Sequence, residues 1–249
     1  MTTADAVLRY ADRPTATIDV FLPDGPARGV VLLLHGGFWR QVYDVTGTLP
    51  LGAALAREGY VAALPEYRRV PGPGDDLGDE AGGWPTTCED VEAAYDALPA
   101  LLATLGVESG PAHLVGHSAG GHLALWLAGR GKPAAGVVAL APVADLVDAV
   151  ATRMGAGAAI DFLGGTDVPR DADPAQLLEA RPTYPVTVLH GTADAPVPLA
   201  NAQGLVARHP WIDLRELDGI DHMSLIDPDA PPYADLLAAL ADQQDPTVV

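Results

Sequence analysis

The sequence predicts an α/β fold, with a mostly parallel central sheet and helices on both of its faces. Strand-like runs alternate repeatedly with Ala- and Leu-rich runs of helical character. The run GVVLLLHGG at 29–37 is apolar almost throughout. This pattern is typical of a strand that is covered on both sides in a parallel sheet. One such sheet accommodates the whole chain, so we expect a single domain over residues 1–249.

The alternation defines the expected elements in order. Strand-like runs occupy 16–23, 29–37, 61–68, 112–116, 134–143, 184–191 and 211–217. Helix-like runs occupy 50–60, 85–106, 118–129, 198–209 and 233–243. The first strand alternates with a period of two, which indicates an antiparallel strand, and the second helix begins with Pro and ends in Gly. Residues 144–181 interrupt the alternation, and we expect a small cap there, over the carboxyl edge of the sheet.

Charge and cysteine content narrow the class of protein. The chain has 33 Asp and Glu against 14 Lys and Arg, a formal charge of −19, which disfavours nucleic acid and anionic membranes. Cys88 is the only cysteine, so no intrachain disulfide forms, as fits a reducing compartment. No secretory signal and no membrane-spanning run is visible. We expect a cytoplasmic protein that acts on a small molecule without contacting a membrane.

A glycine-flanked serine lies between a predicted strand and a predicted helix. The sequence GHSAG at 116–120 fits the pattern Gly-x-Ser-x-Gly. A sharp turn there strains the backbone of Ser118 and crowds the residues two before and two after it, which Gly116 and Gly120 relieve. The helix N-terminus places the N–H group of Ala119 where an oxyanion would develop. We therefore interpret Ser118 as a nucleophile rather than an incidental turn residue.

The serine needs a general base, since a neutral hydroxyl is a weak nucleophile. In this type of fold the order along the chain is Ser, then an acid, then His. Asp194 follows a predicted strand, and only His209 and His222 come after it. His209 ends a helix at the opposite edge, whereas His222 lies in a loop at the edge where Ser118 is expected. We predict that Asp194 orients His222, with Asp221 and Asp218 as weaker candidates for the acid.

The loop in LLLHGGFWR (32–40) is the second part of the expected site. Its two glycines let backbone N–H groups approach a ligand closely. We expect the N–H groups of Gly37 and Phe38 to bind an oxyanion together with that of Ala119, and His35 to brace the loop. The residues that we place in the substrate pocket are Trp39, Trp84, His117 and Met223. No metal-ligand spacing or nucleotide-binding motif is present, so we expect no metal and no cofactor.

Three segments carry a resemblance to a known family: HGGFW at 35–39, GHSAGGHLA at 116–124 and DHMSLIDP at 221–228. With them the chain resembles the α/β-hydrolase superfamily along nearly its whole length. It is more closely similar to the esterase/lipase branch that includes kynurenine formamidase (arylformamidase). The resemblance implies Ser118 as nucleophile, Asp194 as acid and His222 as base. Met223 stands where an aromatic residue often follows the histidine in such enzymes.

The resemblance implies a serine hydrolase of the carboxylesterase or arylformamidase type. Its substrate would be a small carboxylic ester or an aryl formamide like N-formylkynurenine, cleaved through an acyl-enzyme. Three alternatives stay open on the sequence alone. The same triad serves acyl-peptide hydrolases and biosynthetic acyl transferases, and a catalytically silent hydrolase fold can bind a ligand.

Overall fold

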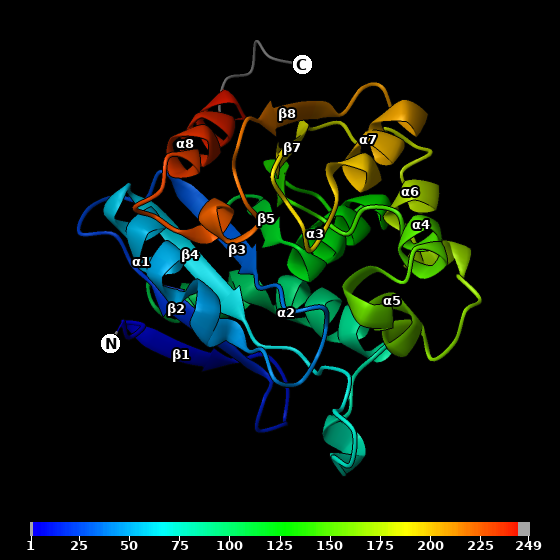
Figure 1. The fold of residues 1–249 in the computed structure, drawn as a ribbon. Helices are drawn as coiled ribbons and strands as arrows, with labels where there is room; N and C mark the ends of the chain where they lie inside the picture. Colours follow the sequence, from blue (N-terminus) through cyan, green and yellow to red (C-terminus); the bar gives the residue numbers. More distant parts are fainter. Residues whose placement is uncertain (1, 244–249) are drawn as a thin grey trace.

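The structure is a computed structural model that describes residues 2–243. Its centre is an eight-stranded sheet (Figure 1). The strands are β1 (Ala6–Arg9), β2 (Thr17–Phe21), β3 (Gly29–Leu34), β4 (Tyr60–Pro65), β5 (His113–His117), β6 (Gly136–Leu140), β7 (Val186–Gly191) and β8 (Asp213–Leu217). Their order is β1-β2-β4-β3-β5-β6-β7-β8; β2 runs antiparallel to both β1 and β4, and all other pairs are parallel. The mostly parallel sheet is confirmed, and β1 is a strand that the sequence did not predict.

Helices cover both faces of the sheet, as predicted. The five expected helices are α1 (Leu49–Arg57), α2 (Thr86–Ala103), α3 (Ala119–Gly129), α7 (Leu199–Arg208) and α8 (Pro232–Asp242). Helices α1 and α8 pack on one apolar cluster of the sheet, whereas α2, α3 and α7 pack on the other (Figure 1). No helix in the described part of the chain combines the length and the apolar character that crossing a membrane requires.

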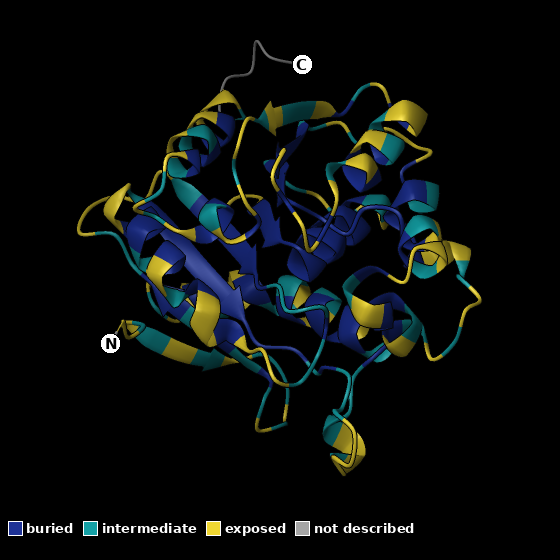
Figure 2. Cartoon of the chain, in the orientation of Figure 1, coloured by how far each residue is buried: buried dark blue, intermediate teal, exposed yellow. Residues whose placement is uncertain are grey.

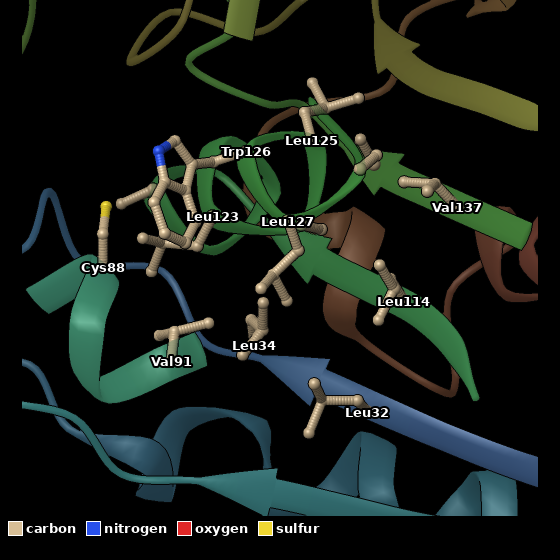
Figure 3. Packing of buried hydrophobic residues seen from close by; sticks show 14 of the residues in the cluster. Leu32, Leu34, Cys88, Val91, Leu114, Leu123, Leu125, Trp126, Leu127 and Val137 are labelled. Atoms are coloured by element: carbon tan, nitrogen blue, oxygen red, sulfur yellow. The ribbon is translucent and has the colours of Figure 1, made fainter. Parts of the chain in front are cut away.

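Strand β3 shows why the core has two halves. Val30, Leu32 and Leu34 belong to the cluster under α2 and α3, and the alternate residues Val31 and Leu33 belong to the cluster under α1 and α8. Figure 3 shows Leu32 and Leu34 below α3, and Figure 2 shows the buried centre of the fold. Each of these side chains contributes about 1.5–3 kcal/mol by leaving water. A strand without a polar face therefore has to be central.

Residues 144–181 contain α4 (Leu146–Ala151), α5 (Met154–Leu163), a 3₁₀ helix η3 (Arg170–Ala172) and α6 (Pro174–Leu177). Phe162 of α5 stacks on Trp39 with ring centroids 4.4 Å apart. An added Cβ atom at Gly155 would lie 2.4 Å from the ring of Phe38. This segment therefore supports the loop that follows β3, and its role as a cap stays a prediction.

The turn between β5 and α3 depends on very close backbone contacts. A Cβ atom added at Gly116 would lie 2.1 Å from the carbonyl oxygen of Gly120, the crowding expected from the sequence. A Cβ atom added at Gly120 would lie 2.0 Å from the carbonyl oxygen of Leu34, at the end of β3. The first turn of α3 is therefore seated directly on the end of the neighbouring strand.

We predict that Gly120→Ala destabilises the protein, because its methyl group meets backbone that has no room to move. The expected loss is about 3 kcal/mol or more in the free energy of unfolding, measured by chemical denaturation. Gly204→Ala is the matched control, since Gly204 also lies within a helix but has open space around its Cβ position. That control should gain up to about 1 kcal/mol. Equal stability of the two variants would contradict the contact at Gly120.

Candidate active site

Ser118 forms the turn between β5 and α3 in a strained conformation. Its φ and ψ angles are 57° and −118°, and the residue is 1% exposed. Its N–H group donates to the carbonyl oxygen of Leu140 (2.8 Å), and its own carbonyl accepts from His122 (3.1 Å) and Val143 (3.2 Å). These bonds to β6 and α3 hold a backbone conformation that a serine rarely adopts.

The hydroxyl group of Ser118 is buried and makes no hydrogen bond with any residue in 2–243. A buried polar atom without a protein partner costs free energy. Ser118 lines a cavity of about 380 Å³, and His222 lines the same cavity. The structure thus brings the expected nucleophile and base to one cavity, without a hydrogen bond between them.

A short hydrogen bond joins the expected base and acid. Nδ1 of His222 donates to Oδ2 of Asp194 at 2.6 Å. The Asp194 side chain is fully buried, and its other oxygen accepts from the N–H group of Val197 at 2.8 Å. A carboxylate is an acceptor only, so it fixes the imidazole tautomer that carries its proton on Nδ1. Nε2 of His222 then bears the lone pair that a general base needs.

His117 holds the loop that carries this histidine. Its Nε2 donates to the carbonyl oxygen of His222 at 3.0 Å, and the two ring centroids are 4.4 Å apart. Burial lowers the pKa of His117 to about 3, so its ring is neutral at ordinary pH. His117 and Met223 line the cavity, in the region where the sequence placed both.

The alternative acids and the alternative histidine make other contacts. Asp221 accepts from the N–H groups of residues 223–224 at 2.9 Å each, at the start of a 3₁₀ helix, η4 (Met223–Ile226). The carboxylate of Asp218 accepts from a threonine hydroxyl at 3.4 Å. His209 donates to the carbonyl oxygen of Ala175 at 2.9 Å. In the described residues, only Asp194 is hydrogen-bonded to the ring of His222.

The loop after β3 lies against the serine turn. A Cβ atom added at Gly36 would lie 3.0 Å from that of Ser118. The next three residues all have positive φ: 104° at Gly37, 53° at Phe38 and 56° at Trp39. No residue in 2–243 accepts a hydrogen bond from the N–H group of Gly37 or Phe38. The N–H group of Ala119, in the first turn of α3, has no partner within its helix.

The two tryptophans expected in the pocket lie elsewhere. Trp39 has no exposed surface; it stacks on Phe162 and meets His122 edge-on at 5.1 Å. Trp84 packs edge-on against Trp126 of α3 at 6.3 Å. The structure therefore does not bring Trp39 or Trp84 to the cavity, because both rings are used in packing around α3 and α5. Trp39 instead anchors the strained loop.

A buried carboxylate that the sequence analysis missed connects two loops of the site. Glu66 accepts from Nε2 of His35 at 3.1 Å and from the N–H group of Val45 at 3.1 Å, and it forms an ion pair with Arg69. His35 also stacks on Tyr67 at 4.2 Å, which agrees with its expected bracing role. Glu66 directly follows β4, whereas the sequence prediction placed it inside a strand over 61–68, so the available signal was a carboxylate within an otherwise mostly apolar run.

The segment at 42–48, which we call the wall loop, forms one side of the cavity and contains a 3₁₀ helix, η1 (Val45–Thr48), at its end. Its lining members are Val42, Tyr43, Asp44, Thr46, Gly47 and Thr48. Pro196 and Ile226 complete the lining together with the residues of the serine turn and the loop after β3. No residue from 144–181 is part of this lining. The wall loop was missed because its residues are ordinary for an exposed loop.

Ser118, His222 and residues 35–38 of the loop after β3 line one cavity, and the imidazole of His222 is oriented by a carboxylate. Ala119, at the N-terminus of α3, is fully buried and is not among the residues that line this cavity. A hydroxyl and an oriented imidazole at one cavity are groups that nucleophilic acyl transfer can use. Within 2–243, no group of three or more His, Cys, Asp or Glu side chains is placed to hold a metal ion.

Solved structures share this fold. The chain has a TM-score of 0.76 with a truncated carbohydrate esterase from gut microbiota, at 16% identity over 97% of each chain. With esterase 2 of Thermogutta terrifontis the TM-score is 0.73, at 20% identity over 97% of this chain and 94% of that one. A protein of Silicibacter sp. tm1040 with a provisional thioesterase assignment gives 0.71, at 25% identity over 94% and 84%. The chain therefore has the α/β-hydrolase fold.

Comparison with protein families gives a more specific result than the fold. No curated protein sequence matches the chain. The BD-FAE family model, however, matches residues 18–208, well over half of the sequence. The matched span runs from β2 to α7 and includes Ser118, Asp194 and the loop after β3. The chain therefore belongs to the BD-FAE family.

Proposed function

We propose that this protein is a serine hydrolase that cleaves small carboxylic esters through Ser118, His222 and Asp194. One observation carries the proposal. The 2.6 Å hydrogen bond from His222 to a fully buried Asp194 lies at a cavity that also contains the unpartnered hydroxyl of Ser118. An imidazole oriented in this way can take the proton of a serine.

In the proposed reaction, Oγ of Ser118 attacks the acyl carbon of the ester while Nε2 of His222 takes the hydroxyl proton. The carbonyl electrons move to oxygen, and the oxyanion accepts hydrogen bonds from Gly37, Phe38 and Ala119. Collapse of this intermediate expels the alcohol, which receives its proton from His222. Water, deprotonated by the same histidine, then releases the carboxylic acid and restores the serine.

Related structures support ester hydrolysis as the reaction class. Esterase 2 of Thermogutta terrifontis has been solved with propionate bound, and also phosphonylated by sarin and phosphoramylated by tabun. Propionate is the acid that hydrolysis of a propionyl ester releases. By analogy, we propose that the esters cleaved by this chain carry a short acyl group.

An aryl formamide is the second candidate substrate, with a formyl-enzyme as the intermediate. The motifs HGGFW, GHSAGGHLA and DHMSLIDP favour it. Acyl-peptide hydrolysis and acyl transfer to an alcohol or amine use the same triad and differ in what enters the cavity. A silent binding fold is disfavoured, since such proteins usually lose a triad member and this chain keeps all three residues.

A direct assay compares p-nitrophenyl acetate and N-formylkynurenine, with the wild type and Ser118→Ala. We expect kcat/KM of about 10⁴ M⁻¹s⁻¹ or more for the better substrate, with loss of that activity in the variant because the nucleophile is gone. Turnover of the ester alone would support an esterase, and turnover of the formamide would support a formamidase. If neither reaction exceeds the background of Ser118→Ala, hydrolysis of small acyl compounds is wrong.

We predict that Asp194→Asn lowers kcat by about 10⁴-fold, because an amide no longer fixes the required tautomer of His222. The side-chain oxygen of Asn can still accept from Val197, so the fold should persist, which circular dichroism checks. Asp221→Asn is the matched control: it removes the same charge beside His222 and should change kcat by less than about threefold. A similar loss in both variants would contradict the assignment of Asp194.

The dependence of kcat/KM on pH should show the uptake of one proton on the acid side. Burial lowers the pKa of His117 to about 3 and that of His122 to about 4, so both stay neutral above about pH 5. The proposed mechanism needs a neutral imidazole at His222, so kcat/KM should fall on the acid side, and neither His117 nor His122 should add a second step to that fall. Initial rates between about pH 5 and 8 measure this slope. A flat profile, or a slope of two, would count against the mechanism.

A further inference from the structure

Among the described residues, those that line the cavity beside Ser118 include an acidic side chain but no basic one. Its lining is mostly apolar or uncharged and, among the residues that the structure describes, includes no Lys or Arg. Within residues 2–243, Asp44 on the wall loop is the only acidic residue that lines the cavity. Other titratable groups that face the cavity are Tyr43 and three imidazoles, His35, His117 and His222. An anionic group that enters this space meets a carboxylate and no fixed cation.

The arginines near the cavity walls are already paired. Arg69, whose charge acts on Asp44, is 4% exposed and forms its ion pair with Glu66. Arg40, next to the wall loop, lies 3.2 Å from the carboxylate of Asp161. Each of these arginines forms an ion pair with a carboxylate other than Asp44, and neither is among the residues that line the cavity.

Asp44 is held in place at the rim. Its Oδ1 accepts from the N–H group of Thr46 at 3.0 Å and from the hydroxyl of the same residue. Burial raises the pKa of Asp44, but these hydrogen bonds and the charge of Arg69 outweigh it and lower the pKa below its usual value. The carboxylate is therefore ionised at neutral pH. Asp44 is exposed to solvent, so dissolved salt can screen its charge.

We propose that the site selects substrates by charge, accepting neutral or cationic esters and rejecting anionic ones, with Asp44 as a specificity-determining residue. The inference rests on the proposed esterase function. An anionic ester loses water on entering an apolar space and gains no cationic partner in return. The acid formed by hydrolysis is an anion as well, so the same arrangement favours its release.

The test uses three aryl acetates that carry a carboxylate, a carboxamide or a trimethylammonium group at the meta position. The acyl group and the ring stay constant, and each kcat/KM is divided by the rate of alkaline hydrolysis of that ester. For the wild type at low salt, we expect the neutral ester to exceed the anionic one at least about tenfold. The ratio of cationic to anionic ester should fall several-fold between about 20 mM and 1 M NaCl.

Asp44→Asn keeps the oxygen that accepts from Thr46 and removes only the charge. It should lower the ratio of cationic to anionic ester about tenfold. The matched control is Glu108→Gln, an equal charge change at an exposed residue just before β5, at the opposite edge of the sheet, which should leave the ratio within about twofold.

The outcomes separate the two proposals. Equal rates for the anionic and neutral esters, or a ratio that neither salt nor Asp44→Asn changes, would overturn charge selection while leaving ester hydrolysis intact. If none of the three esters is cleaved faster than by Ser118→Ala, the esterase function fails, and charge selection fails with it.

Discussion

The geometry of the site depends on one steric contact, the seating of helix α3 on the end of strand β3. The missing Cβ atom of Gly120 lets the first turn of the helix approach the carbonyl oxygen of Leu34. This approach has two effects. It holds Ser118 at the helix N-terminus, and it places the loop that starts at residue 35 against the serine. Ser118 and the loop after β3 lie side by side because two backbones touch, without any long side chain to connect them.

Strain at this edge of the sheet is concentrated in a few residues and balanced by packing. Ser118, Phe38 and Trp39 all have positive φ, although none is glycine. Each such residue costs about 1–3 kcal/mol, and its conformation persists only where the surrounding structure holds it. The hydrogen bonds from β6 and α3 hold Ser118, and the stacking of Trp39 on Phe162 holds the loop. In this way the segment between α4 and α6 contributes to the site without lining its cavity.

Local patterns made much of the architecture predictable. The apolar run of β3 indicated a covered parallel strand, and the glycines around Ser118 indicated a crowded turn. These signals are local, because period and glycine spacing follow from the backbone alone. The hydrogen bond between His222 and Asp194 was expected from chain order and from which strands end at the active edge.

Other features depend on which side chains meet in three dimensions, and no local pattern reports that. The ring of Trp39 follows two glycines next to the site, yet it turns into the packing between α3 and α5. Strand β1 has a short, half-exposed pattern that resembles a loop, and it is defined by pairing with β2. The wall loop has no distinctive composition, and its place at the cavity follows from the anchoring of Val45 by Glu66.

The anchoring of Val45 by Glu66 determines which residues around the cavity can be substituted without moving the backbone. One buried carboxylate fixes the backbone of the wall loop at Val45 and, through His35, the base of the neighbouring loop. The bond to Val45 uses a backbone N–H group, so it does not depend on which side chain residue 45 carries. Lining residues whose side chains do not bond the loop backbone, such as Val42, can therefore be exchanged while the frame beneath them keeps its shape. Such exchanges would change the shape and charge of the cavity and leave Ser118, Asp194 and His222 where they are.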